Sequence, residues 1–284
     1  MSAPTNDAAA PRQATKVVRR PRALLRGVDG PLVQAGEMTR LALEVLWMAI
    51  RRPWGYWAEV RDQSFDILKL CWIPMAVSCT AFGLGAPGLQ GGNLFSLFGI
   101  PERLGSFFVM ASIREFAPWV NAMVVAGVVG TAITADLGAR RIREEIDAME
   151  VLGVDPVRTL VLPRVIALFI MTGLLDLVAL MFGILGGYIA AVPILGANPA
   201  AFVDSLFNNL TTTDVWGSVI KTALFGLIIG VVCCYKGLHA SGGPIGVGRA
   251  VNQAVVIAFA AIWIFNMVFT TILLGLNPDI QVYR

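Results

Sequence analysis

Charged side chains are densest between residues 136 and 156, where both signs alternate over a short stretch. Opposite charges stand four residues apart at three places, a spacing that stabilises an exposed helix through ion pairs. These pairs are Arg140/Glu144, Arg141/Glu145 and Arg143/Asp147, with Glu150 beyond them. A rigid helix with this charge pattern suits docking into a groove on a soluble partner.

An apolar stripe runs along the same predicted helix. Ile142, Ile146 and Met149 recur at i, i+4 and i+7, the spacing of one helix face. Gly138 is expected to break the chain before the helix, and Gly153 to cap it in the left-handed conformation. A merely solvated loop helix is the alternative, but it would leave the apolar stripe with little to pack against.

No motif for metal or nucleotide chemistry occurs in the sequence. The four cysteines lie in or beside apolar runs, no C-x-x-C occurs and His239 is the only histidine, so we expect no zinc site. The cysteines are expected to pack as small apolar residues. G-x-x-x-x-G-K-[ST], H-E-x-x-H and G-x-S-x-G are absent, so we expect neither ATP in a P-loop nor a catalytic site in this chain.

Three further charged residues fall at or inside long apolar runs, where charges rarely face lipid. Arg114 and Glu115 flank the outer end of one run, where they could line or gate a cavity or act as an interfacial anchor. Asp176 lies within another run, and we expect it to make a hydrogen bond to a neighbouring helix. A proton relay is the alternative, which the absence of another acid or histidine in a span disfavours.

The elements that position these residues are membrane-spanning helices. Of 284 residues, 56% are apolar and 14% charged, and the mean hydropathy is +0.71. A soluble domain carries about 25% charged residues, so a soluble enzyme is disfavoured, and so is a disordered chain. Runs of about 20 apolar residues predict transmembrane helices. Five such runs cover residues 67–84, 116–135, 165–195, 215–235 and 254–276.

The third run is longer than one span requires. We expect it to be tilted, broken at Gly186-Gly187 or extended beyond the bilayer. Two pairs of glycines stand four residues apart, Gly183/Gly187 and Gly226/Gly230. Such pairs permit close helix packing, and a dimer seam is the narrower alternative.

The chain is expected to divide into three regions. Residues 1–35 are polar and basic, which predicts a disordered cytoplasmic tail. Residues 36–62 predict an interfacial helix, because the charged side chains fall in one narrow arc and an aromatic cluster follows. A helix of a small soluble domain is the alternative for this stretch. Residues 63–284 then form the membrane domain.

The distribution of Lys and Arg predicts the orientation. Basic residues are concentrated in the N-terminal region and in the 136–164 and 236–253 loops, whereas the 85–105 and 196–214 loops hold only Arg103 between them. The positive-inside rule therefore predicts a cytoplasmic N-terminus. Five spans then place the C-terminus outside.

Several stretches of the sequence resemble one known family. They are Arg114–Pro118, Ala126–Gly138, Arg143–Pro156, Leu162–Arg164, Gly183–Gly187, Cys234–Leu238 with Gly242-Gly243, and Ala250–Gln253. Together they resemble the MlaE/YrbE permeases, the membrane subunits of ABC transporters that work with MCE-domain proteins on lipids. The sequences of residues 135–140 and 142–150 are similar to those of the actinobacterial YrbE branch. Val128 stands where the family often has Arg or Lys, so no role of that basic residue is carried over.

The resemblance implies an all-α membrane protein with an N-terminal interfacial helix, five transmembrane helices and one cytoplasmic coupling helix. Residues 139–152 would be the coupling helix, docked on a separate ABC ATPase that binds ATP and Mg²⁺. A second YrbE-type permease, more often a different paralogue, would complete a dimer around a lipid cavity that opens toward a ring of MCE proteins. The implied location is the plasma (inner) membrane, with no cofactor in this chain and no nucleic acid as partner.

Two other classes of membrane protein fit the sequence less well. An ion- or proton-coupled carrier often shows inverted repeats and several intramembrane ionisable groups. Here the spans are odd in number, no repeat is evident and only Asp176 is expected to lie deep. An intramembrane enzyme would need a nucleophile with its base, or paired acids, within the spans, and none is visible.

Single cysteines at positions 145 and 282 test the predicted topology. In a variant without the four native cysteines, a membrane-impermeant thiol reagent added to intact cells should label position 282. Position 145 should react only after the cells are opened, because its loop carries the excess of Lys and Arg. Labelling of both positions from the same side would require an even number of spans between them, which contradicts the model of five spans.

Overall fold

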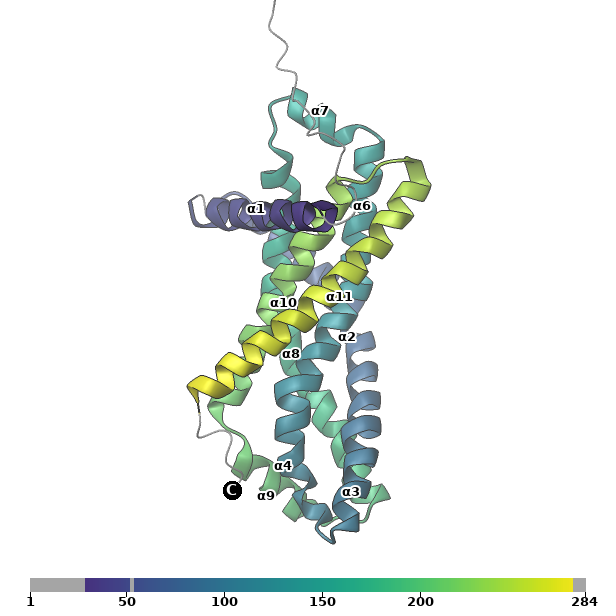
Figure 1. The fold of residues 1–284 in the computed structure, drawn as a ribbon, viewed down its shortest axis with the longest axis vertical. Coiled ribbons are helices and arrows are strands. Elements are labelled where there is room, and N and C mark those ends of the chain that lie inside the picture. The colour runs from purple at the N-terminus through teal and green to yellow at the C-terminus, as the bar shows by residue number, and fades with distance from the viewer. Residues whose placement is uncertain (1–28, 52–53, 278–284) are drawn as a thin grey trace, which may run out of the picture. The chain divides into compact units, whose positions relative to one another are not determined.

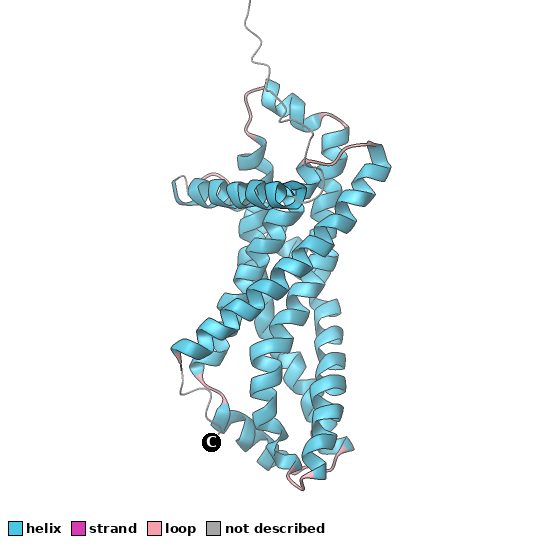
Figure 2. Ribbon diagram, viewed as in Figure 1, coloured by secondary structure: helices cyan, strands magenta, loops and turns pink. Residues whose placement is uncertain are grey.

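The computed structural model describes residues 29–51 and 54–277, and the regular secondary structure within them is helical throughout (Figure 2). Within the described chain, residues 29–37 belong to a different unit from residues 38–51 and 54–277. Five helical segments of the described chain are long and apolar enough to cross a membrane, which confirms the predicted fold class. They are Trp57–Leu97, Pro101–Ile142, Val157–Ile194, Thr212–Leu238 and Gly243–Leu276.

Short π-helical turns join α-helices within the first three of these segments. The first consists of α2 (Trp57–Gly83), η1 (Leu84–Gln90) and α3 (Gly91–Leu97). The second consists of η2 (Pro101–Arg103, a 3₁₀ turn), α4 (Leu104–Phe108), η3 (Val109–Phe116), α5 (Ala117–Val125), η4 (Ala126–Gly130) and α6 (Thr131–Ile142). The third consists of η5 (Val157–Val161), α8 (Leu162–Ile189) and η6 (Ala190–Ile194).

The remaining helices are shorter connections or single long rods. They are α1 (Asp29–Arg51), α7 (Glu145–Val151), α9 (Pro199–Asn209), α10 (Thr212–Leu238) and α11 (Gly243–Leu276). In Figure 1, α7 lies at one end of the bundle, and α3, α4 and α9 lie at the other. The charged connection therefore lies at one end of the spans, and the apolar connections that contain proline and glycine lie at the other end.

Several expected boundaries differ from the structure. The helix α1 begins at Asp29, inside the stretch expected as a tail, and α2 begins at Trp57, inside the stretch expected as an interfacial helix. Most of the 85–105 loop is helical, because η1 and α3 continue the first span. The third segment remains helical through Gly186-Gly187, which excludes a break there and leaves a tilt or an extension beyond the bilayer as the alternatives. Residues 1–28 of the predicted tail and the C-terminal residues from 278 onward lie outside the described chain.

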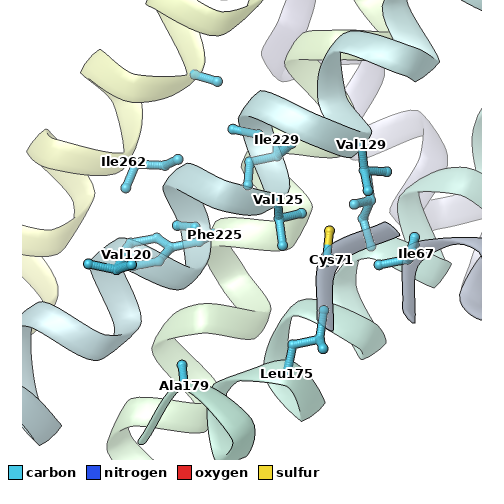
Figure 3. Close-up of a cluster of buried hydrophobic side chains, with 14 of the residues drawn as sticks. Ile67, Cys71, Val120, Val125, Val129, Leu175, Ala179, Phe225, Ile229 and Ile262 are labelled. Atoms are coloured by element: carbon cyan, nitrogen blue, oxygen red, sulfur yellow. The ribbon is translucent and has the colours of Figure 1, made fainter. Parts of the chain in front are cut away.

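The helix α8 lies at the centre of the bundle and packs mainly against α2 and α10. Figure 3 shows side chains from these helices meeting in one apolar core, among them Cys71, Leu175 and Phe225. All four cysteines are buried, as the sequence predicts. Because lipid tails are as apolar as these side chains, the fit between helices has to come from close packing and a few polar contacts.

Small residues allow that close packing. A Cβ added at Gly226 would lie 2.7 Å from Thr172 Oγ1 and closer still to the Leu168 carbonyl oxygen, both on α8. A Cβ at Gly230 would lie 3.2 Å from Val165 Cα, also on α8. Gly183 and Gly187 likewise face neighbours in their own chain, Ser112 and Phe108. The two glycine pairs therefore lie at contacts between helices of one chain.

Asp176 links α8 to α10 through a buried hydrogen bond. Ser218 Oγ donates to Asp176 Oδ2 at 2.6 Å, and both side chains are almost fully buried. Asn121 Nδ2 of α5 donates to the Thr172 carbonyl oxygen of α8 at 2.8 Å, one helical turn away. Asp176 Oδ1 has no hydrogen-bond partner among the described residues. The expected contact between helices is thus present, and it brings three helices together.

Substitution of Asp176 separates hydrogen bonding from proton transfer. Asp176→Asn keeps an acceptor for Ser218 and should be tolerated, whereas Asp176→Leu should lower the free energy of unfolding by about 1–2 kcal/mol. Thermal unfolding of the purified protein in detergent measures the difference. Ser218→Ala should cost stability in the wild type and almost nothing in the Asp176→Leu background. Complete loss of transport by a stable Asp176→Asn variant would instead indicate a protonation role.

Candidate functional site

The charged stretch between the second and third spans is divided into two helices at Glu144. Glu144 has a φ of 61° and a ψ of 16°, the left-handed conformation that usually belongs to glycine at a helix end. The expectation of one continuous helix over residues 139–152 is therefore wrong. Gly138 does not break the chain, because it lies inside α6, where a Cβ would meet Val247 Cγ1 at 3.1 Å.

The break at Glu144 changes the ion pairs of this segment, because residues four apart no longer share one helix face. Arg143 Nε donates to Glu145 Oε1 at 2.8 Å, and Arg141 pairs with Asp147. Arg140 Nε lies 3.2 Å from Asp136 Oδ1. The three expected pairs are thus replaced by contacts of Arg141 and Arg143 with α7 and by one i, i+4 pair inside α6.

Asp136 connects this segment to the centre of the bundle. Arg164 Nη2 of α8 donates to Asp136 Oδ2 at 2.5 Å, while Arg140 of α6 reaches the other carboxylate oxygen. The Arg164 side chain is largely buried and also donates to the Leu160 carbonyl oxygen at 3.3 Å. The carboxylate thereby holds the ends of α6 and α8 together beside α7.

The apolar surface of α7 differs from the predicted stripe. Ile146 is buried within the chain, and Ile142 and Met149 are half-buried. The exposed apolar residues are Val151 and Leu152, with 87% and 80% of their surface accessible. Gly153 follows them with a φ of 77°, the left-handed cap that the sequence predicts. Sequence periodicity missed Val151 and Leu152 because neither lies on the stripe, although two apolar residues before a capping glycine were a readable signal.

A second group of functional candidates lies among the spans, away from α7. We call it the polar cluster, and it consists of Arg114, Glu115, Asp214, Lys221, Asn266 and Thr270. Arg114 and Glu115 belong to η3, inside the continuous Pro101–Ile142 segment and not at the end of a span as expected. The other members come from α10 and α11, more than 90 residues further along the chain.

Arg114 and Asp214 form a buried ion pair in this cluster. Arg114 Nε lies 2.7 Å from Asp214 Oδ1, and the two side chains are 9% and 0% exposed. The second oxygen of Asp214 accepts hydrogen bonds from the backbone nitrogen and hydroxyl of Thr211, at 2.9 and 2.7 Å. Asp214 thus caps α10 and neutralises Arg114 at the same time.

Glu115 and Lys221 connect three helices in the same cluster. Glu115 accepts hydrogen bonds from Asn266 Nδ2 and Thr270 Oγ1 of α11, both at 2.7 Å. Lys221 Nζ lies 3.8 Å from Glu115 Oε1, donates to the Arg114 carbonyl oxygen and lies 3.3 Å from Thr270 Oγ1. Every charge in the cluster therefore has a neighbour of opposite sign or a hydrogen-bond partner.

This arrangement corrects the expectation that Asp176 alone lies deep. Lys221 is 2% exposed and stands within the fourth span, and Asp214 is also buried. The sequence does place Lys221 inside an otherwise apolar run, which was the available signal. Its partners could not be found in the same way, because their distance along the chain is about 100 residues.

A surface groove of about 550 Å³ lies beside the polar cluster. Its lining combines Glu115, Asn266, Thr270 and Thr271 with the apolar residues Trp263, Ile264 and Met267 of α11. Trp263, Ile264 and Met267 are exposed in the single chain. The groove therefore offers hydrogen-bonding groups beside an apolar surface, a combination suited to an amphipathic molecule.

Comparison with known proteins identifies the family. The model for the family described as permease MlaE matches residues 62–272. A probable ABC transporter permease of Rickettsia felis is 35% identical over 198 residues, which are 70% of this chain and 76% of that protein. A probable ABC transporter permease of Synechocystis is 36% identical over 178 residues, covering 63% and 68% of the two chains.

A plant protein is also similar. Protein TRIGALACTOSYLDIACYLGLYCEROL 1, chloroplastic, from Arabidopsis thaliana, is 32% identical over 177 residues, covering 62% of this chain and 51% of its own length. The matched residues 62–272 include α7 and the polar cluster. The chain belongs to the MlaE permease family, as a multi-pass membrane permease of the ABC transporter type.

Proposed function

We propose that this chain is the permease subunit of an ABC-type lipid transporter that works with extracytoplasmic MCE proteins. It moves hydrophobic lipids across or out of the plasma membrane, with energy from ATP that a separate ATPase subunit binds together with Mg²⁺. The observation that carries this proposal is α7, a short charged helix fixed between two spans with an exposed apolar tip, Val151 and Leu152. A soluble protein remains bound to such a surface by burying the tip and pairing the surrounding charges.

The groove beside the polar cluster supports a lipid as the transported molecule. A headgroup that donates hydrogen bonds would reach Glu115, while acyl chains would lie along Trp263 and Met267. The Arabidopsis relative is named after a diacylglycerol lipid, which agrees with this class of substrate. Arg114 and Glu115 are then positioned at the lipid pathway, and Asp176 stabilises the helices behind it.

The distribution of Lys and Arg supports the proposed orientation, and the exposed face of α11 supports the proposed assembly. The α7 end faces the cytoplasm and the ATPase, while the end with α3, α4 and α9 faces the MCE ring outside. A second permease, in this branch more often a different paralogue, covers the exposed face of α11. The N-terminus is then cytoplasmic and the C-terminus extracytoplasmic.

Negative charges at the tip of α7 should release the ATPase. We expect the double variant Val151→Asp, Leu152→Asp to fold normally, because both side chains are already exposed. Unpaired charges in a desolvated interface cost about 2–5 kcal/mol, which is enough to abolish co-purification with the ATPase. Leu97→Asp is the matched control, since Leu97 is 85% exposed at the opposite end of the bundle. Wild-type co-purification and ATPase activity in the double variant would exclude α7 as the coupling element.

The energy source distinguishes this proposal from a proton-coupled carrier. Such a carrier is the alternative because buried charges could bind and release protons. In proteoliposomes containing this chain, its partner permease and the ATPase, transfer of a fluorescent lipid should require ATP hydrolysis. Collapse of an imposed pH gradient should leave the rate unchanged, because the charges of the polar cluster are already paired with one another. Transfer that is driven by the gradient in the absence of ATP would contradict the proposal.

A further inference from the structure

The part of α1 that belongs to the larger unit has two apolar faces. Met38, Leu41 and Val45 are buried in the core. A second set lies exposed at i, i+3, i+4 and i+7, and consists of Leu43, Leu46, Trp47 and Ile50. A helix with an exposed apolar stripe beside a charged one lies at the boundary between headgroups and acyl chains. We therefore expect the C-terminal end of α1 to lie at the level of lipid phosphates.

A cleft of about 300 Å³ opens at that end of α1. Its apolar surface comes from Trp47 and Met48 of α1 and Leu162 of α8, and its charged surface from Arg51, Asp155 and Arg158. The volume is at the lower end of the range of about 300–1,000 Å³ that is typical of small-molecule sites. The cleft shares no residue with the groove beside the polar cluster.

The net charge of this cleft is positive. Neither Arg51 nor Arg158 has an ion-pair partner among residues 29–51 and 54–277. Arg51 lies over the Trp47 ring, 5.7 Å from its centroid, which holds the guanidinium beside the exposed apolar stripe. Asp155 Oδ1 accepts from the backbone nitrogens of Val157 and Arg158 at 2.9 and 3.4 Å, so this carboxylate is engaged at the start of the helix.

We propose that this cleft binds the phosphate headgroup of an anionic phospholipid in the leaflet on the α7 side. Arg51 and Arg158 contact the phosphate oxygens, and the first part of the acyl chains lies against Trp47, Met48 and Leu162. Guanidinium groups favour phosphate because their donors match its oxygens in pairs. The apolar surface and the neighbouring exposed stripe select a lipid over free phosphate, which would use only the arginines.

The charges that line an adjoining cavity indicate on which side of Arg158 the phosphate binds. That cavity, of about 500 Å³, shares Asp155 and Arg158 with the cleft but replaces Arg51 by Glu59. It therefore opposes one guanidinium with two carboxylates, which disfavours an anion. The phosphate is expected between Arg51 and Arg158, where two positive groups face one engaged carboxylate.

Lipid titration of the purified full-length chain in detergent, followed by native mass spectrometry, tests this site. The wild type should bind phosphatidylglycerol more tightly than phosphatidylcholine. Each arginine near a membrane surface contributes about fivefold in affinity, so Arg51→Gln with Arg158→Gln should weaken phosphatidylglycerol binding about 25-fold. Phosphatidylcholine binding should weaken less, because its choline group offsets the charge of the phosphate. The Arg51→Lys, Arg158→Lys variant should bind between the wild type and the double Gln variant, because it keeps both charges but loses the paired donors of guanidinium. An unchanged melting temperature shows that each variant is folded.

A matched control and a competitor complete the test. Arg61→Gln removes an arginine that is 78% exposed and already paired with Asp62 at 3.0 Å, and it should leave lipid binding unchanged. Excess inorganic phosphate should not displace phosphatidylglycerol. The proposal is overturned if the double Gln variant binds phosphatidylglycerol like the wild type, or if Arg61→Gln weakens it equally. Displacement by inorganic phosphate would assign the cleft to a free anion instead of a lipid.

Discussion

An ammonium group buried among three helices organises one half of this bundle. Lys221 of α10 contacts the Arg114 carbonyl oxygen and Glu115 of η3, and it lies next to Thr270 of α11. A charge in this position is costly unless its partners remain in place. The cluster therefore constrains the relative positions of η3, α10 and α11 more strongly than apolar contacts could, because those contacts have equivalent alternatives in lipid.

The polar cluster also explains how α11 is held in the bundle although few of its side chains are buried. Only a few small or branched residues of this helix are buried in the chain, among them Ala254, Ala258 and Ile262. Its attachment to η3 depends on two hydrogen bonds from Asn266 and Thr270 to Glu115. Apolar packing on one side and polar contacts near the far end together hold a helix whose outer face stays available to other molecules.

The sequence predicted the elements that depend on composition and missed those that depend on tertiary contact. Five apolar runs were enough to find five spans, because the bilayer sets their minimum length. Their extensions could not be read in this way, since η1 and α3 continue a span through a stretch rich in glycine that looks like a loop. The left-handed Glu144 was equally hidden, because glutamate rarely adopts this conformation without surrounding structure to impose it. Asp176 was recognisable from its surroundings, but Ser218 was not.

A left-handed residue stands at each end of α7, and this affects how a movement of α7 could reach the rest of the chain. Glu144 and Gly153, both left-handed, act as joints on either side of a short rod. If a displacement of α7 were transmitted only along the backbone, rotation at these two residues would absorb it. Arg140 pairs with Glu145 across the joint at Glu144, and Asp136 pairs with both Arg140 and Arg164, so these side chains connect α7 to α8 by a second, shorter route. We therefore expect a displacement of α7 to reach α8 through these side chains as well as along the backbone.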